Sequence, residues 1–420
     1  MISKQFSFLK RRLLKNNLFF HHKLKKLHEE RLYGSDRILE IQQEKLINTI
    51  KYAYNKSPFY RNLYDRYDVN LKQVQNTGDL GILPIVTKNM VRKNTSDILT
   101  SSPIFCTKGF TSGTSGNPLM VYRDYYSTIT EEAYLWRNRI ENGHTLGERS
   151  VSLRGDLNNN IFKVKDTFSN TLYLSSYQLK RKAISRYYEE IIKFKPKAIF
   201  AYPSSVEILA NFLLEEGLQL DIPFVFTSSE TLYSFQRHKI ESAFNSTVID
   251  RYGNAERTIL IEQDANGTYN EVPTYSVNEY EKDRTICTSL INNTFPLIRY
   301  EVNDTIETGH TRGVIITIQG RSDDVVILPD GTKIGRLGVP LKGLDYIKLA
   351  QLVQNEVSEL NVNIVPYSKL DQDKFNQIKT KLVSYLGNDI RININEVTEN
   401  IIKKSASGKF KLVINNINNK

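Results

Sequence analysis

The chain has 420 residues, 40% of them hydrophobic and 25% charged, a composition that fits a globular protein of two or more domains and excludes extended disorder. Its net charge of +11 is concentrated at one end: residues 1–28 hold eight Lys or Arg and no acid, which leaves 49 basic against 46 acidic residues elsewhere. A nucleic-acid-binding protein normally carries a basic stripe on its folded body, so this distribution argues against that class. Two cysteines and six scattered histidines form neither a disulfide framework nor a zinc-binding pattern, which fits a cytoplasmic location without structural zinc.

Residues 1–36 form a basic leader in which Phe and Leu alternate with Lys and Arg. Charges recur too often for a membrane span, and the leader lacks the apolar core and cleavage site of a signal peptide. Two interpretations remain open. Residues 1–28 would lie on an anionic membrane at its inner face, or they would form an amphipathic helix packed on the protein's own body.

The next segments alternate between helix and strand patterns. Residues 37–66 are predicted to be a helix, and 83–88 a short turn that leads to another. Strands are predicted at 198–202, 224–227 and 247–250, and helices from 206 and over 231–244, with a capping box formed by Ser204 and Glu207. Helical crossovers of this length predict a layered α/β fold with a mainly parallel sheet.

Three loops follow these strands, at 203–205, 227–230 and 251–256. Binding residues of such folds lie at the carboxyl ends of the strands, so we expect the three loops to form one site. Tyr202, Phe224 and Phe226 are either an apolar wall of that site or part of the core.

The pattern changes after Arg321. Residues 325–334 are predicted to be two short strands joined by a turn at 329–331, followed by a helix near 373–386 and strands near 389–396 and 409–415. We therefore divide the chain into the leader, a large domain at 37–322 and a small mobile α+β domain at 323–420.

The segment Thr111-Ser-Gly-Thr-Ser-Gly-Asn-Pro118 places two glycines and four hydroxyl residues in eight positions. Glycine lets backbone amides point at an anion, and hydroxyl groups add donors, so the segment is suited to phosphates. It does not match a Walker P-loop. By itself it would also fit a plain flexible loop.

Residues of four later segments add chemistry that an ATP site needs. Tyr252 is suited to stacking on a base, and Glu256 is suited to Mg²⁺. Asp304 follows a strand and is suited to ribose hydroxyls, Arg321 lies at the predicted domain boundary, and Lys409 lies on a predicted turn. Each also has a structural alternative as a core, surface or turn residue.

In combination and order these motifs resemble the adenylate-forming (acyl-CoA synthetase) superfamily, in the phenylacetate–CoA ligase-like branch that includes capsule-biosynthesis, CapK-like proteins. The resemblance runs from residues 53–61 through 83–88 to Lys409. It implies ATP and Mg²⁺ as cofactors and coenzyme A as a further one. The family's usual Lys after the second loop glycine is Asn117 here, and Thr227-Ser-Ser-Glu230 replaces a Gly-rich turn near the acyl pocket.

The resemblance also implies roles for individual residues. The ATP phosphates would be held by Thr111, Ser112, Gly113, Thr114, Ser115 and Gly116, and the nucleotide further by Tyr252, Gly253, Asn254, Ala255, Asp304 and Arg321. Glu256 and Thr114 would bind the metal, and Asp323 would be the hinge. Lys409 and Glu256 would be catalytic, and the acyl pocket would include Tyr202, Pro203, Ser204, Ser228, Ser229 and Glu230.

The activity implied is ATP-dependent activation of a small carboxylic acid and transfer to coenzyme A or to an amine, such as an amino sugar in surface polysaccharide synthesis. Two alternatives stay open: a nucleotidyltransferase that adenylylates a cofactor, and a non-catalytic scaffold in polysaccharide assembly. The sequence does not identify the acid.

Overall fold

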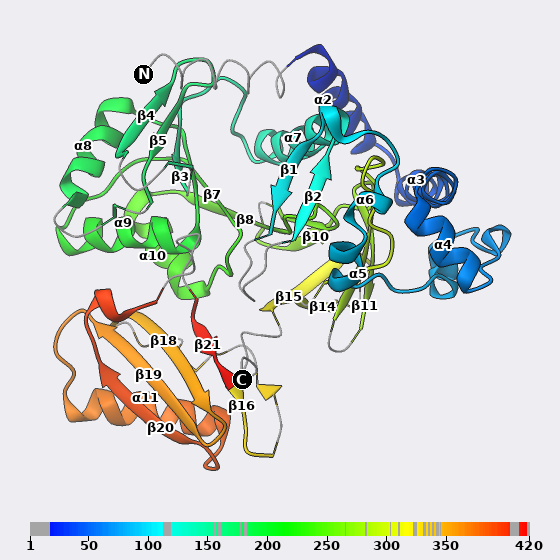
Figure 1. Ribbon diagram of the computed structural model, residues 1–420. Helices are drawn as coiled ribbons and strands as arrows, with labels where there is room; N and C mark the ends of the chain where they lie inside the picture. The colour runs from blue at the N-terminus through cyan, green and yellow to red at the C-terminus, as the bar shows by residue number, and fades with distance from the viewer. Residues whose placement is uncertain are drawn as a thin grey trace.

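The structure, a computed structural model, describes residues 17–111, 119–154, 156–157, 161–176, 178–179, 183–264, 266–281, 284–302, 304–309, 311–321, 326–330, 333–334, 337, 340–341, 344, 346–403 and 411–417. Figure 1 shows a large body of α/β layers and a smaller sheet-and-helix unit below it. Within the described part of the chain, no helix combines the length and the apolar character needed to cross a bilayer.

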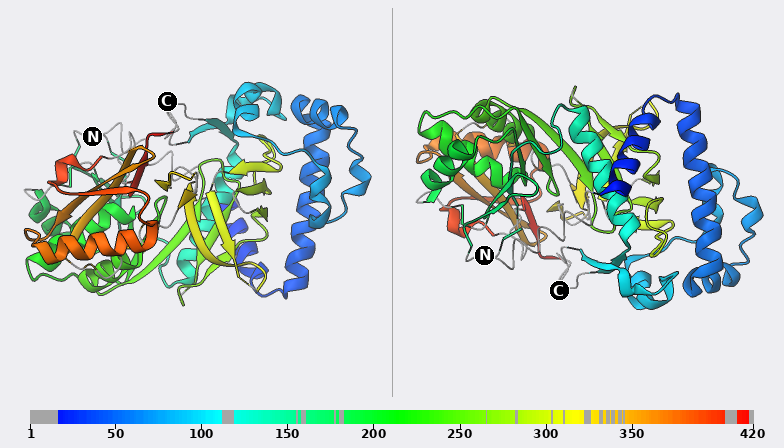
Figure 2. Two further views of the ribbon diagram at one scale, coloured as in Figure 1. Left: turned by 90° about the horizontal axis from the view of Figure 1, so that it is seen from below. Right: turned by 90° about the horizontal axis from the view of Figure 1, so that it is seen from above.

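Helix α2 (Leu18–Glu30) is capped by Asn17, whose side chain accepts a hydrogen bond from the Phe20 amide at 3.2 Å. Its buried residues Phe20, Leu24 and Leu27 share a core cluster with helix α7 (Tyr125–Glu141), and the two helices lie side by side in Figures 1 and 2. For this part of the leader, the structure therefore shows a helix packed on the protein's own body. The rest of the leader, 1–16, lies outside the described residues.

The predicted helix at 37–66 is two helices, α3 (Ser35–Lys56) and α4 (Pro58–Arg66). Pro58 lacks an amide hydrogen, so the first helix ends and a second starts. Ser57 has an extended backbone and caps α4. Short helical segments follow: η1 (Leu71–Gln73), η2 (Thr77–Ile82), α5 (Lys88–Lys93), α6 (Thr95–Ile98) and η3 (Pro103–Phe105). After them, strands β1 (Thr107–Phe110) and β2 (Met120–Arg123) pair as an antiparallel hairpin.

The main sheet has ten strands in the order β14-β15-β10-β9-β8-β7-β6-β3-β5-β4. They are β3 (Ser150–Leu153), β4 (Lys163–Asp166), β5 (Thr171–Leu174), β6 (Ala198–Ala201), β7 (Phe224–Ser228), β8 (Thr247–Gly253), β9 (Leu260–Gln263), β10 (Tyr269–Glu271), β14 (Asp304–Thr308) and β15 (Val314–Arg321). The five adjacent strands β5, β3, β6, β7 and β8 are parallel, as predicted. The strands on either side of them pair antiparallel, so the sheet is mixed.

Helices cover both faces of the parallel strands. Helices α8 (Ile184–Phe194), α9 (Pro203–Glu215) and α10 (Ser234–Phe244) share a core cluster with one face, where Ile199 and Val225 are fully buried. Phe200 and Phe226 project to the opposite face and pack with the ring of His144, just beyond α7. The alternation follows from the period of two along a strand. Of the two interpretations for Phe226, the structure therefore supports the core.

A second sheet of three antiparallel strands lies beside the first: β11 (Ser276–Tyr280), β12 (Thr285–Ser289) and β13 (Tyr300–Val302). A core cluster joins it to α3 and α4 through residues such as Ile50, Tyr60 and Tyr300. The hydroxyl of Tyr60 donates to the Pro296 carbonyl at 3.1 Å and accepts from the Ile298 amide at 2.9 Å. These bonds hold the amino-terminal helices against a sheet more than 200 positions away.

The carboxyl-terminal part begins with the predicted strand pair, β16 (Val326–Ile327) and β17 (Lys333–Ile334), which is antiparallel. A sheet in the order β20-β19-β18-β21 follows, with helix α11 (Gln372–Leu386) packed on it through Ile378 and Leu382. Its strands are β18 (Ile347–Glu356), β19 (Glu359–Pro366), β20 (Arg391–Glu396) and β21 (Val413–Asn415), and η5 (Glu399–Ile401) precedes β21. Among the residues that the structure describes here, strands together with helix α11 agree with the predicted α+β character.

Candidate nucleotide-binding site

The predicted phosphate loop lies in the sequence between the paired strands β1 and β2, and of its residues the structure describes Thr111. Phe110 lies opposite Met120, and one step beyond, the Thr111 amide donates to the Leu119 carbonyl at 3.0 Å. The Thr111 hydroxyl accepts from the Leu119 amide at 2.9 Å, so Thr111 closes the base of the loop. The predicted phosphate contacts Ser112, Gly113, Thr114, Ser115 and Gly116 lie outside the described residues.

Arg123, at the end of β2, connects this hairpin to the predicted nucleotide motif. Its guanidinium group lies across Gly109, where any Cβ would fall inside contact distance, and it donates a hydrogen bond to the Ala255 carbonyl. Burial and the neighbouring Arg257 lower the pKa of Arg123 to about 10, so it stays protonated at neutral pH. Sequence reasoning missed Arg123, because nothing in the local pattern distinguishes an arginine that ends a short strand.

The motif at 252–256 turns sharply after β8. Asn254 holds the turn, because its side chain accepts from the Thr258 amide at 2.9 Å and donates to the Thr258 hydroxyl at 2.6 Å. Arg257 has a left-handed backbone with φ of 59°, a conformation that is strained for residues other than glycine. Gly253 itself is still part of β8, so the predicted loop at 251–256 is a strand end followed by a tight turn.

Two tyrosines connect this turn to residues near position 300. The Tyr300 hydroxyl donates to Glu256 Oε1 at 3.0 Å, and the Tyr252 hydroxyl donates to Asp304 Oδ2. Burial, and then the Asp304 carboxylate, raise the pKa of Tyr252 far above its ordinary value, so the phenol remains a proton donor. Asp304 opens β14 opposite Arg321 of β15. The Arg321 side chain is outside the described residues.

The predicted acyl-pocket residues lie at the carboxyl ends of β6 and β7. Glu230 Oε2 accepts from the Ser204 amide at 3.0 Å, and Oε1 accepts from the Ser204 hydroxyl at 3.1 Å. The predicted capping box of Ser204 with Glu207 is therefore wrong. Helix α9 starts at Pro203, after Tyr202, and a carboxylate from another strand end satisfies its first turn. Glu207 is instead buried against Gln236, with 2.7 Å between Glu207 Oε2 and Gln236 Nε2.

Sheet register brings these segments to one edge. Ala201 lies beside Thr227, Thr227 beside Asp250, and Ser228 beside Arg251. Tyr202 and Ser229 therefore follow β6 and β7 directly, and Tyr252 is among the last residues of β8, so all three are at the same edge of the sheet, as the crossover pattern predicted. Ser229 has φ of 71°, the backbone that a Gly-rich turn would adopt. The predicted hinge Asp323 and the predicted catalytic Lys409 lie outside the described residues.

The described side chains fit Mg·ATP chemically. Glu256 Oε1 is engaged by Tyr300, and Oε2 has no hydrogen-bond partner among the described residues, which leaves a carboxylate oxygen for a cation. Mg²⁺ in proteins is typically held by one or two carboxylates together with substrate phosphates and water. Asp304 places its carboxylate beside the half-buried Tyr252 ring, an arrangement that suits a nucleoside.

Comparisons with known proteins agree with this architecture. Residues 326–416 match the family described as the CapK C-terminal domain. Protein CapK of Staphylococcus aureus is 24% identical to this chain, over an alignment that covers 98% of this chain and 94% of that protein. Indoleacetate–lysine synthetase of Pseudomonas savastanoi is 25% identical, covering 77% of this chain and 86% of that protein.

Among solved structures, 2-hydroxyisobutyryl-CoA ligase in its postadenylation state superposes with a TM-score of 0.71 at 16% identity, covering 91% of this chain and 90% of that chain. Anthranilate CoA ligase AuaEII gives a TM-score of 0.53 at 16% identity, with 80% and 73% covered. The fold is thus that of the adenylate-forming ligases. Within that superfamily, the sequence similarity is to the CapK-like branch, over almost the whole length of protein CapK and over the CapK C-terminal domain.

Proposed function

We propose that this protein uses Mg·ATP to activate a carboxylic acid as an acyl adenylate and then transfers the acyl group to an acceptor. One observation carries the proposal. Hydrogen bonds connect the β1–β2 hairpin, the turn at 252–256 and residues 300–304 to one another. They run from Arg123 to Ala255, from Tyr252 to Asp304 and from Tyr300 to Glu256. These contacts hold the residues expected to bind the nucleotide close to one another, as an ATP site requires.

The chemistry explains why such residues are useful. A carboxylate must attack the α-phosphate of ATP, so the site has to bring two anions together, mainly by positioning and charge neutralisation. Glu256 would hold Mg²⁺, which neutralises phosphate charge when bound. Asp304 would fix the ribose, and Lys409 would bridge the carboxylate and the α-phosphate. No general base is required for this step, since the attacking carboxylate is already ionised.

The acceptor is a thiol, that of coenzyme A, or an amine. The name of the Pseudomonas savastanoi relative describes joining an acid to lysine, whereas several structural neighbours are described as CoA ligases. Between these, we favour an amine, because the relative that names an amine acceptor is recognisable in sequence, while the CoA ligases share the fold alone. An amino sugar of a surface polysaccharide is one such amine.

We further propose that the small domain at 323–420 moves about Asp323 between the two half-reactions, so that Lys409 leaves and the acceptor enters. In the structure this domain is docked on the large one. The Tyr367 hydroxyl donates to Asn211 Oδ1 of α9 at 2.6 Å, and Lys348 Nζ lies 3.0 Å from Glu215 Oε1. The docked position superposes better on the postadenylation form of the hydroxyisobutyryl-CoA ligase, with a TM-score of 0.71, than on its thioesterification form, with 0.55.

The decisive test is carboxylate-dependent exchange of pyrophosphate with ATP, first screened with aryl, fatty and amino acids. Lys409→Ala should abolish the exchange and leave ATP binding nearly unchanged. Lys411→Ala, which removes the same charge two positions away, is the matched control and should retain exchange. Undiminished exchange in Lys409→Ala would remove this lysine from the mechanism.

Two measurements separate the alternatives. A nucleotidyltransferase would yield a stable adenylylated product in place of released AMP. A non-catalytic scaffold would not bind ATP in calorimetry.

Asp304→Ala should raise the ATP dissociation constant by about tenfold, because hydrogen bonds to charged groups contribute about 1.5–3 kcal/mol. An unchanged constant would contradict the ribose contact.

The outward face of α2 favours a peripheral membrane contact. Leu18 and Phe19 are 86% and 70% exposed, and Lys25 and Lys26 are exposed on the same helix. Apolar and basic residues together bind anionic interfaces. Full-length protein should sediment with vesicles rich in phosphatidylglycerol and not with neutral ones, and equal behaviour with both would refute the contact.

A further inference from the structure

A large cavity lies away from the candidate nucleotide site. Its volume is about 970 Å³, and it is lined by the end of α2, the start of α3, the end of α7 and strands β9 to β11. None of the described nucleotide- or acyl-site residues lines it. The volume is within the range of small-molecule pockets.

The sheet separates the two sites. Glu262 of β9, which lines the cavity, pairs with Arg251, whereas Tyr252 pairs with Ile261. Residues directly opposite each other in an antiparallel pair share a face, and successive residues alternate. Glu262 therefore projects from one face of the sheet and Tyr252 from the other.

Glu30 is the most unusual residue of the cavity. It is the last residue of α2 and is only 3% exposed, yet neither oxygen of its carboxylate has a hydrogen-bond partner in the described part of the chain. No described cation forms an ion pair with it. The nearby Lys45 instead donates to the Thr274 carbonyl at 3.0 Å. A buried carboxylate without a partner is costly, so a ligand that supplies one is the natural explanation.

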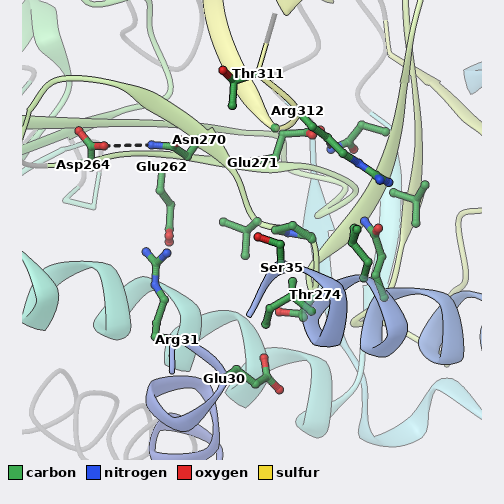
Figure 3. A pocket seen from close by; sticks show the side chains of 18 of the residues that line it. Glu30, Arg31, Ser35, Glu262, Asp264, Asn270, Glu271, Thr274, Thr311 and Arg312 are labelled. Atoms are coloured by element: carbon green, nitrogen blue, oxygen red, sulfur yellow. Dashed lines mark hydrogen bonds between the residues drawn. The ribbon is translucent and has the colours of Figure 1, made fainter. Parts of the chain in front are cut away.

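The other unsatisfied atoms of the lining are also mostly acceptors. The two further acceptors are Glu262 Oε1 and Asn278 Oδ1, and the Glu262 side chain is buried, with 4% exposed. The one donor, Arg137 Nε, lies 3.7 Å from Glu141 Oε1, and the same guanidinium group donates to Glu262 Oε2. In Figure 3, Glu30 lies on the helical side of the cavity and Glu262 on the side of the sheet. Unused acceptors on both sides call for a ligand that donates hydrogen bonds.

The net charge of the residues that line the cavity also favours a cationic ligand. Six acidic residues line the cavity against three arginines: Glu30, Glu141, Glu262, Asp264, Glu271 and Glu279 against Arg31, Arg137 and Arg312. Arg31 pairs with Glu141 at 2.8 Å, and Arg137 pairs with Glu262, so the arginines do not neutralise Glu30. A protonated amine carries three donors, no acceptor and one positive charge.

We propose that this cavity is a second, non-catalytic binding site for a small organic compound with protonated amino groups, and that Glu30 is its anchoring residue. Because two separate carboxylates have unused oxygens, a diamine fits better than a monoamine. The site is independent of ATP, so its failure and that of the proposed ligase activity are distinguishable.

The test is isothermal titration calorimetry of the full chain without nucleotide. The probes are 1,4-diaminobutane and the neutral butane-1,4-diol of the same length, at matched ionic strength. The diamine should bind saturably with one site and the diol should not. Absence of saturable diamine binding, or equal binding of the diol, would overturn the proposal.

Two variants and one control locate the site. Glu30→Gln should weaken diamine binding at least about tenfold, the loss of one charged hydrogen bond. Glu29→Gln makes the same change at the exposed neighbour and should bind like the unaltered chain. Ile38→Trp should block the cavity while leaving Glu30 in place. Unchanged affinity in Glu30→Gln or in Ile38→Trp, or an equal loss in Glu29→Gln, would exclude this cavity.

Folding is measured alongside. Glu30→Gln removes a buried charge, so its melting temperature should be equal to or above that of the unaltered chain. The comparison of diamine with diol needs no variant and decides the question even if a variant unfolds.

Discussion

The hydroxyl of Tyr252 donates a hydrogen bond to the carboxylate of Asp304, 52 positions further along the chain. This bond joins the end of β8 to the start of β14, two strands with β9, β10 and β15 between them in the order of the sheet. The expected base-stacking residue and the expected ribose acceptor are therefore held in a fixed relationship.

Tyr252→Phe should keep the ring and remove the bond. Asp304 then loses a donor, so we expect the ATP dissociation constant to rise about three- to tenfold and the free energy of unfolding to fall by about 1 kcal/mol. Tyr280→Phe removes a comparable bond, to Glu271, and serves as control. It should cost stability without changing ATP affinity. Calorimetry and urea unfolding measure both, and an equal loss of ATP affinity in the two variants would contradict this role of Tyr252.

Gly109→Ala should disturb the hairpin that carries the phosphate loop. A Cβ at this position meets the Arg123 guanidinium group, which is held in place by its bond to Ala255. We expect a loss of about 1–3 kcal/mol in stability, as for other overpacked sites, together with weaker ATP binding. Gly81→Ala is the matched control, because no atom lies within 4 Å of its Cβ. Normal ATP affinity in Gly109→Ala would show that Arg123 does not position the loop.

Tyr367→Phe should loosen the docking of the small domain. It removes the 2.6 Å bond to Asn211 and leaves a buried side chain without its partner. Small-angle scattering should then show a larger radius of gyration. Tyr346→Phe loses a hydroxyl that bonds within the small domain, to Gln377 at 2.9 Å, and should leave the radius unchanged. A radius that stays the same in Tyr367→Phe would mean that other contacts hold the domain.

His144 should make stability depend on pH. Its ring is fully buried and stacks on Trp136 at 5.7 Å, and burial, followed by Arg139, lowers its pKa to about 4. The unfolded chain binds this proton near pH 6.5, whereas the native chain does not until about pH 4. The contribution of His144 to the free energy of unfolding is therefore fully present above pH 6.5. It is lost as the pH falls toward 4, by up to about 3 kcal/mol.

The variant His144→Phe isolates this effect. Urea unfolding at about pH 7 and about pH 4.5 should show a smaller loss in the variant than in the unaltered chain, because ordinary carboxylates titrate in both. The facing Glu148, whose Oε2 lies 3.1 Å from His144 Nδ1, has its own pKa lowered and acts mainly at lower pH. Equal losses in both proteins would refute the buried neutral histidine.

Several features followed from the sequence alone. The strands near 198, 224 and 247 and their crossover helices were predicted because period and turn signals are local, and parallel register then brings Tyr202, Ser229 and Tyr252 to one edge. The superfamily was recognisable from the order of its motifs, since each motif is short and continuous. Helix boundaries were less secure. Pro58 divides a helix predicted as one, although its effect on the backbone is also local.

Only the tertiary structure decided which side chains meet. The capping of Ser204 by Glu230 and the bond from Tyr252 to Asp304 join residues 26 and 52 positions apart, and the position of Arg123 over Gly109 depends on how two strands pair. No short sequence pattern encodes such pairs. The same holds for the cavity at Glu30. A glutamate at the end of a helix is ordinary in sequence, and it becomes a candidate ligand anchor only because packing buries it where no described residue gives its carboxylate a hydrogen bond.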